Sequence, residues 1–324
     1  MQKSPETKEK IMKKALLFPG QGSQIVGMGK DMAAQFSAAR EVFEEVDAAL
    51  NEKLSSVIFE GPQDILTQTR NAQPAIMATS IAVLRVLQKE YGFDVAKQAA
   101  FVAGHSLGEY SALCAAGALS LTDTARLLRV RGNAMQQAVP AGRGAMAALI
   151  GADIEAATAI ASEAAQGEIC VVANDNAPGQ VVISGTKTAV ERAIEIAKAK
   201  GVKRAILLEV SAPFHCPLMA PASGIMEEAL SAAKISAPCV PLVANVTAKA
   251  ESNPADIRRL LVDQVTGVVR WRESISYIKS RNILRAVEIG AGKVLTGLVK
   301  RIEPEMECIA IGTPADLEAF ARVE

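Results

Sequence analysis

The 324-residue chain carries no net charge, because its 35 Lys and Arg residues are matched by 35 Asp and Glu residues. It also lacks a basic run interleaved with aromatic residues, which is the pattern of a nucleic-acid-binding surface. No apolar run approaches the ~20 residues that a membrane span requires. We therefore expect neither a nucleic-acid nor a membrane partner.

Cysteine is scarce and irregularly spaced, so no CxxC pair or Cys/His cluster marks a zinc site. The five cysteines are Cys114, Cys170, Cys216, Cys239 and Cys308. We expect reduced thiols, a cytoplasmic location and no bound metal. Residues 1–11 are polar and lack the apolar segment of a signal peptide, and we expect a disordered extension there.

The nucleotide-binding glycine motifs are also missing. The stretch FPGQGSQIVGMGK (18–30) follows the first apolar run, but its glycines fit neither the Gly-x-Gly-x-x-Gly dinucleotide motif nor the P-loop. Two interpretations remain. It is either an ordinary tight turn, or a loop whose backbone N–H at Gln21 stabilises an oxyanion, as early strand-to-helix loops do in α/β acyl-transfer sites.

The chain does contain an alternation of short apolar runs with amphipathic helical patterns. Strands are predicted at 14–18, 98–104, 241–246, 283–290 and 308–312. Helices are predicted at 31–50, 75–91, 106–119, 121–139, 254–265 and 271–281, with Thr122 as the N-cap of the fourth. Such alternation is typical of an α/β fold with a parallel sheet.

The pattern changes after Pro140. A strand, a helix, two strands around the loop NDNAPG, a second helix and a last strand follow over roughly 70 residues, which is the ferredoxin-like β-α-β-β-α-β order. We therefore interpret 141–211 as a small ferredoxin-like domain inserted into a large α/β domain formed by 12–140 and 212–324.

The stretch GHSLGEY (104–110) has the Gly-x-Ser-x-Gly spacing of a nucleophile elbow. An apolar strand precedes it and a helix rich in small residues follows it, as the elbow requires. The helix N-terminus favours developing negative charge, and the N–H of Leu107 is placed to stabilise an oxyanion. We predict that Ser106 is a nucleophile, against the alternative of an incidental serine in a glycine-rich turn.

A serine hydroxyl needs a base, and the chain has only two histidines, His105 and His215. His105 adjoins the serine, but neighbouring side chains on a sharp elbow point in different directions. We expect His105 to brace the turn. His215, in the proline-flanked stretch SAPFHCPLM (211–219), is then the predicted general base. No acidic residue stands out as a third member, and a backbone carbonyl can also fix the histidine tautomer.

Arg131 is predicted to emerge from the buried face of its helix. Its neighbours three and four positions away are all apolar, unlike those of Arg126 and Arg129. A buried cation needs an anionic partner. That partner is either an internal carboxylate or the carboxylate of a substrate held in a bidentate clamp, and the residues alone leave the two open.

Five stretches together resemble one family, the malonyl-CoA:acyl carrier protein transacylases and the related acyltransferase domains of fatty acid and polyketide synthases. They are FPGQGSQ, GHSLGEY, RGNAMQQAVP, FHCPLM and VEIGAGKVLTGL, and they occur in the family's order. The resemblance covers nearly everything from Met12 onward. It implies a hydrolase-like α/β domain with a ferredoxin-like small domain.

The resemblance also implies roles for individual residues. Ser106 matches the family's nucleophile, His215 its base and Arg131 its carboxylate-binding arginine. Two further residues match its pocket, namely Gln73 in NAQPAI and Asn174 in the small-domain loop facing the cleft.

The rest of the expected site also rests on the resemblance. The backbone N–H groups of Gln21 and Leu107 match the oxyanion hole, and the backbone carbonyl of Gln264 matches the group that orients the histidine. Phe214, before the histidine, matches a pattern that prefers malonyl over bulkier methylmalonyl groups.

The implied activity is two-step transfer of a malonyl group from malonyl-CoA, through a malonyl-serine ester, to the phosphopantetheine thiol of acyl carrier protein in fatty acid synthesis. We expect this chain to be a monomer that binds no cofactor and uses the CoA thioester as a substrate. Two alternatives stay open: a serine thioesterase or esterase with the same elbow, and a malonyl-CoA-binding protein without catalysis.

Overall fold

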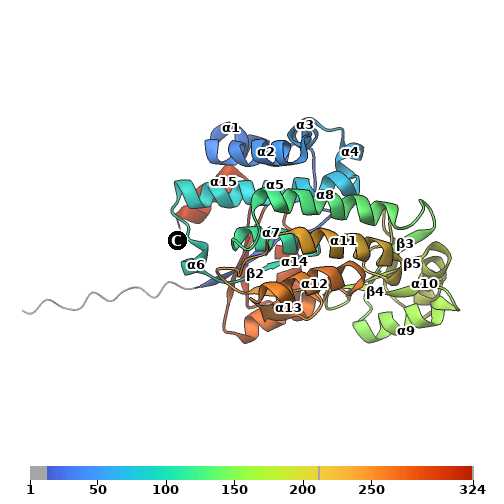
Figure 1. Ribbon diagram of the computed structural model, residues 1–324. Coiled ribbons are helices and arrows are strands. Elements are labelled where there is room, and N and C mark those ends of the chain that lie inside the picture. Colours follow the sequence, from blue (N-terminus) through green and yellow to red (C-terminus); the bar gives the residue numbers. More distant parts are fainter. Residues whose placement is uncertain (1–12, 211, 323–324) are drawn as a thin grey trace, which may run out of the picture.

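The computed structural model describes residues 13–210 and 212–322 (Figure 1). The extension expected at 1–11 lies outside these residues. The main sheet consists of β1 (Lys14–Phe18), β2 (Ala99–Gly104), β7 (Leu242–Ala244), β8 (Lys249–Glu251), β9 (Arg285–Ile289) and β10 (Glu307–Ile311). These six strands lie in the order β10-β9-β1-β2-β7-β8, and all neighbours are parallel except β7 and β8.

Helices surround this sheet (Figure 1). In chain order they are α1 (Lys30–Gln35), α2 (Ser37–Leu50), α3 (Leu54–Glu60), α4 (Gln63–Thr67), α5 (Thr69–Glu90), α6 (Val95–Gln98), α7 (Gly108–Ala115), α8 (Leu121–Gln137), α11 (Ala220–Ala232), α12 (Pro254–Thr266), α13 (Trp271–Ser280), α14 (Val294–Ile302) and α15 (Pro314–Ala321). A short 3-10 turn, η1 (Pro217–Met219), precedes α11.

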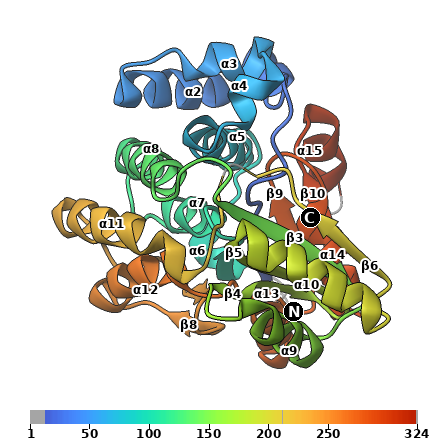
Figure 2. The same ribbon diagram turned by 90° about the vertical axis from the view of Figure 1, so that its right-hand side faces the viewer.

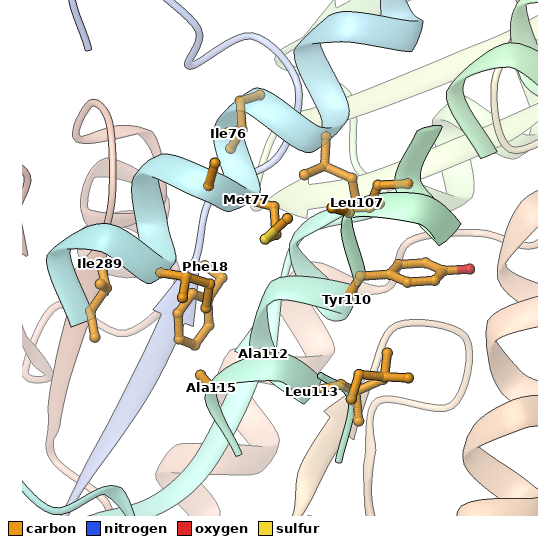
Figure 3. Close-up of a cluster of buried hydrophobic side chains, with 14 of the residues drawn as sticks. Phe18, Ile76, Met77, Leu107, Tyr110, Ala112, Leu113, Ala115 and Ile289 are labelled. Carbon is orange, nitrogen blue, oxygen red and sulfur yellow. The ribbon is translucent and has the colours of Figure 1, made fainter. Parts of the chain in front are cut away.

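The central strand β1 is buried along its whole length, as expected of a parallel strand covered on both faces. Its side chains alternate between two apolar cores. Leu16 and Phe18 belong to the core that contains α5 and α7, whereas Ala15 and Leu17 belong to the core that contains α13 and α14. Figure 3 shows Phe18 among residues of α5 and α7. The sheet is therefore sandwiched between helical layers, which leaves its strand ends for function.

A second, antiparallel sheet lies beside the first (Figure 2). Its strands are β3 (Gly144–Ile150), β4 (Cys170–Ala177), β5 (Gln180–Thr186) and β6 (Arg204–Leu207), in the order β4-β5-β3-β6. Helices α9 (Ile154–Ala165) and α10 (Lys187–Ala199) share one apolar core with it. Along the chain these elements run β3-α9-β4-β5-α10-β6, and β4 continues through most of NDNAPG, so the loop predicted there is largely strand.

The two sheets are joined by backbone pairing between β4 and the segment before α13. Val269 N donates to Ala173 O at 2.9 Å, and Asp175 N donates to Val269 O at 3.0 Å. The buried Asp175 carboxylate also pairs with Arg272, at 2.7 Å. Backbone bonds of this kind hold β4 in a defined position against the large domain.

The helix predicted at 31–50 is two helices in the structure. Phe36 has extended backbone angles (φ −122°, ψ 122°), which end α1 and begin α2. The N-cap prediction for α8 was also wrong. Ser120, two residues before Thr122, accepts the backbone N–H of Asp123 and caps the helix.

Helix α5 begins at Thr69, earlier than predicted, and contains Pro74. A proline has no N–H, so the carbonyl four residues earlier, Arg70 O, loses its helical donor. Arg129 of α8 supplies one instead, since its Nη1 lies 2.7 Å from Arg70 O. Arg129 is therefore buried too, contrary to the prediction from its neighbours, and it also pairs with Glu52 at 2.8 Å.

The backbones of α5 and α8 approach closely beside this bond. A Cβ atom at Gly132 would lie 2.7 Å from Arg70 Cα and 2.8 Å from Thr69 O, so only glycine fits there. This close approach brings the neighbouring Arg131 against the start of α5.

A matched pair of glycine substitutions tests the packing of α7 on β1. A Cβ at Gly108 would lie 2.2 Å from Phe18 O, whereas a Cβ at Gly224 in α11 would meet nothing within 4 Å. We expect Gly108→Ala to lower the free energy of unfolding by about 1–3 kcal/mol. Gly224→Ala, with better helix propensity and no clash, should raise it by about 0.5–1 kcal/mol. Urea unfolding followed by circular dichroism measures both, and equal effects would contradict the close packing at Gly108.

Candidate active site

Ser106 lies in the sharp turn between the carboxyl end of β2 and the start of α7. Its φ of 53° is in the left-handed region, which non-glycine residues rarely adopt. The turn is held by the buried side chain of Asn245, whose Oδ1 accepts Ser106 N at 2.8 Å and whose Nδ2 donates to Gly104 O at 2.7 Å. The predicted elbow geometry is therefore present, with support from a residue at the end of the neighbouring strand β7.

His215 lies against the serine. Its Nε2 is 2.8 Å from Ser106 Oγ, and its Nδ1 is 2.9 Å from the backbone oxygen of Gln264. A carbonyl oxygen only accepts, so Nδ1 carries the ring proton and Nε2 is free to accept the serine proton. Burial lowers the pKa of His215 to about 3, with a further contribution from the positive charge of Arg131. The imidazole is neutral at pH 7, as a base must be.

His105 is turned away from the serine hydroxyl. Its Nε2 lies 2.8 Å from Asn176 Oδ1, and its ring packs against Trp271 with centroids 5.6 Å apart. Burial lowers the pKa of His105 as well. These contacts link the elbow to β4 and α13, as expected of a residue that braces the turn.

Arg131 is 1 % exposed, and its guanidinium reaches the Ser106 hydroxyl. Its Nη2 donates to Ser106 Oγ at 3.2 Å and to Gln264 Oε1 at 2.9 Å, and its Nη1 donates to Gln73 Oε1 at 2.8 Å. Within 13–210 and 212–322, no carboxylate forms an ion pair with it. Of the two partners left open by the sequence, the internal ion pair is therefore not made.

A cavity of about 340 Å³ opens onto these groups between the two sheets. Its polar lining contains Gln21, Gln73, Ser106, Arg131, Asn174 and His215, and its apolar lining contains Leu107, Met135, Met146, Val182, Leu208, Val210 and Phe214. Of the site residues predicted from the sequence, only Gln264 is not in this lining, and it lies directly behind His215 and Arg131. Asn174 comes from strand β4 and not from a loop.

Sequence reasoning missed the polar groups beneath the elbow: Asn245, Asn176, Glu109 and the side-chain amide of Gln264. One signal was available for Asn245, which directly follows a buried strand, because polar residues at the carboxyl ends of parallel strands gather at one edge. Glu109 lies inside the elbow stretch itself, but nothing local showed that its carboxylate is buried.

Among the residues that the structure describes, no group of three or more His, Cys, Asp or Glu side chains could hold a metal ion. In the same part of the chain, no helix combines the length and the apolar character needed to cross a membrane.

Comparison with known proteins gives consistent matches over almost the whole chain. A family model described as acyl transferase domain matches residues 15–307. The malonyl CoA-acyl carrier protein transacylase of Bacillus subtilis (strain 168) is 49 % identical over 309 residues, which cover 95 % of this chain and 96 % of that protein.

Solved structures agree. An acyl-carrier-protein-S-malonyltransferase from Bartonella henselae is 58 % identical with a TM-score of 0.94, covering 96 % of this chain and 99 % of that one. A malonyl-transacylase solved in complex with a type II PKS acyl-carrier protein is 42 % identical with a TM-score of 0.93, covering 96 % of this chain and 100 % of that one. The chain therefore belongs to the acyl transferase domain family, alongside the malonyl CoA-acyl carrier protein transacylases.

Proposed function

We propose that this chain transfers a malonyl group from malonyl-CoA to the phosphopantetheine thiol of acyl carrier protein, in fatty acid synthesis. The observation that carries the proposal is the contact of Ser106 Oγ with both His215 and a buried Arg131 that has no ion-pair partner among the described residues. A nucleophile, a base and a receptor for a carboxylate thus meet at one point of one cavity. The names of the full-length relatives support the same substrate and acceptor.

The first half-reaction acylates the serine. His215 Nε2 takes the proton of Ser106 Oγ, and the oxygen attacks the thioester carbonyl of malonyl-CoA. The backbone N–H groups of Gln21 and Leu107 are the proposed donors to the oxyanion of the tetrahedral intermediate. Its collapse breaks the C–S bond, and the imidazolium returns its proton to the departing thiolate of CoA.

Arg131 selects the acyl group. Its guanidinium is charged and buried, and its partners near the cavity are neutral amide and hydroxyl oxygens. A malonyl carboxylate supplies the missing negative charge and accepts charge-assisted hydrogen bonds. An acetyl group has nothing to pair with the cation, so the site disfavours it.

The second half-reaction repeats the chemistry with a different nucleophile. His215 takes the proton of the phosphopantetheine thiol, and the sulfur attacks the malonyl-serine carbonyl. The C–Oγ bond breaks, and the serine recovers its proton from the imidazolium. Because CoA leaves before the second thiol enters, ping-pong kinetics follow.

We interpret the antiparallel sheet with α9 and α10 as a ferredoxin-like small domain, within 141–211, carried by a hydrolase-like large domain. The strand order β4-β5-β3-β6 with two helices in one core supports this. The small domain then supplies Asn174 and several apolar residues to the cavity wall. Monomeric state, cytoplasmic location and the absence of a cofactor stay predictions.

An intact-mass experiment separates the transacylase from its alternatives. Incubation with malonyl-CoA should add one malonyl group to Ser106, stable until acyl carrier protein is added and then transferred to it. Continuous release of CoA with hydrolysis would indicate a thioesterase, and the absence of an adduct would indicate a binding protein. Ser106→Ala should give no adduct, which controls for labelling elsewhere.

Replacing the arginine tests the selection of the acyl group. We expect Arg131→Ala to lower kcat/KM for malonyl-CoA roughly 100-fold, because a charged hydrogen-bonded pair is lost, and to leave acetyl-CoA nearly unaffected. Arg126→Ala, on the same helix but bonded to Ala49 O at the surface, is the matched control. A malonyl-over-acetyl preference that survives Arg131→Ala would remove the clamp from the mechanism.

The pH dependence of serine acylation tests the state of His215. A lowered pKa keeps the imidazole unprotonated, and so active as a base, well below its ordinary titration range. Labelling of Ser106 by an arylsulfonyl fluoride should slow by less than about threefold from pH 8 to pH 5.5, whereas a base of ordinary pKa would lose roughly tenfold. A steep decline centred near pH 6.5, in protein shown to be folded at each pH, is the contrary result.

A further inference from the structure

The side-chain amide of Gln264 stands between the buried arginine and a buried acid. Its Oε1 accepts Arg131 Nη2 at 2.9 Å, and its Nε2 donates to Glu109 Oε2 at 2.6 Å. The same Nε2 lies 3.0 Å from Ser106 O. Since the backbone oxygen of Gln264 also holds His215, one fully buried residue contacts the cation, the base and the nucleophile's backbone.

Glu109 is an acceptor for this amide whatever its protonation state. Its Oε2 accepts both Gln264 Nε2 and, at 3.2 Å, Asn245 N. Its other oxygen, Oε1, is buried and has no hydrogen-bond partner. Burial raises the pKa of Glu109 to about 7, although bonds from Gln264 and Asn245 and the charge of Arg131 act in the opposite direction. A proton on Oε1 leaves both bonds at Oε2 in place.

The hydrogen bond to Arg131 requires that the amide oxygen, and not its NH₂ group, face the guanidinium. If the amide were reversed, its NH₂ group would face the guanidinium, and its oxygen would face Glu109 Oε2 and Ser106 O. Both ends would then meet groups of their own kind, donor against donor and acceptor against acceptor. Nε2 has three acceptors, Glu109 Oε2 at 2.6 Å, Ser106 O at 3.0 Å and Asn245 Oδ1 at 3.4 Å, so the acid is the nearest of the groups that set the direction of the amide.

An amide beside Arg131 leaves the positive charge available to a substrate, whereas an acid would not. A carboxylate directly on Arg131 would form a buried ion pair, which would compete with an incoming substrate carboxylate. The neutral oxygen of Gln264 satisfies one guanidinium N–H without cancelling the charge. Glu109 lies one side chain further away, where it bonds to the amide and makes no direct hydrogen bond to the guanidinium.

We propose that Glu109 is a positioning residue, which keeps the Gln264 amide oxygen facing Arg131 and so holds the guanidinium, unpaired, where a substrate carboxylate can reach it. The inference rests on the carboxylate-binding role proposed for Arg131. Glu109 itself does not line the cavity and touches no reacting atom.

Three substitutions at Glu109 separate hydrogen bonding from charge and from size. Glu109→Gln keeps an acceptor of the same length, and kcat/KM for malonyl-CoA should stay within about threefold of the wild type. Glu109→Leu removes the nearest acceptor of the amide and should lower that value about 10- to 100-fold, while kcat/KM for acetyl-CoA changes less than about threefold. In Glu109→Asp the side chain is shorter, so its carboxylate lies further from Gln264. This variant should also lower kcat/KM for malonyl-CoA, and it keeps the test available if Glu109→Leu does not fold.

The matched control is Glu288, a second fully buried glutamate, which lies outside the cavity. Its carboxylate accepts hydrogen bonds from the backbone N–H groups of Leu295 and Thr296 at the start of α14. Glu288→Leu should lower thermal stability but leave the malonyl-over-acetyl ratio unchanged. A ratio that changes equally in both leucine variants would show that the effect at Glu109 is merely structural, and would overturn the proposal.

A mutant cycle with Arg131 completes the test. If Glu109 acts through the arginine, Glu109→Leu should cost nothing further for malonyl-CoA in an Arg131→Ala background. A full additional loss in that background would overturn the inference about Glu109 and leave the clamp intact. A Glu109→Gln enzyme as impaired as Glu109→Leu would also overturn it, because charge and not hydrogen bonding would then be required. Failure of Arg131→Ala alone to change the preference would instead reject the carboxylate-binding role proposed for Arg131.

Discussion

The buried charge of Arg131 is the constraint on which the rest of the site depends. A guanidinium removed from water is unfavourable unless its donors and its charge are both compensated. Amide and hydroxyl oxygens of Gln73, Gln264 and Ser106 satisfy donors, but they leave the charge. Burial lowers the pKa of His215, and the nearby cation lowers it further. Under the proposed function, the buried charge thus serves twice, because it helps to keep the base neutral and it attracts the substrate carboxylate.

The second sheet both lines the cavity and helps to hold the elbow in place. Backbone bonds between Ala173, Asp175 and Val269 tie β4 to the large domain, and Asn176 on the same strand binds His105 at the elbow. Beyond Val269, Arg270 N donates to the backbone oxygen of Asn245, whose side chain holds Ser106 N. The wall of the cavity and Ser106 are therefore held by one continuous set of hydrogen bonds.

The parts of this site that could be predicted from the sequence are those with a local pattern. The elbow is a five-residue spacing, and the apolar surround of Arg131 is a property of one helix. The polar network is different, because Asn245 lies 139 residues from Ser106 and Gln264 lies 155 from Glu109. The strand order, with β7 beside β2, brings Asn245 to the elbow, and the packing of α12 brings Gln264 there. The misplaced cap had a local cause: Ser120 and Thr122 are both good N-cap residues, and chemistry alone does not choose between them.

The close approach of α5 and α8 at Gly132 has a consequence for the size of the acyl group. Arg131 directly adjoins this contact: its guanidinium donates to Gln73 of α5 and lies 3.2 Å from Ser106 Oγ. The packing of α8 on α5 therefore fixes the position of the helix that carries the cation. Under the proposed function, the carboxylate of the acyl group must bind this close to the serine, so the site fits a short dicarboxylic acyl group better than a longer homologue.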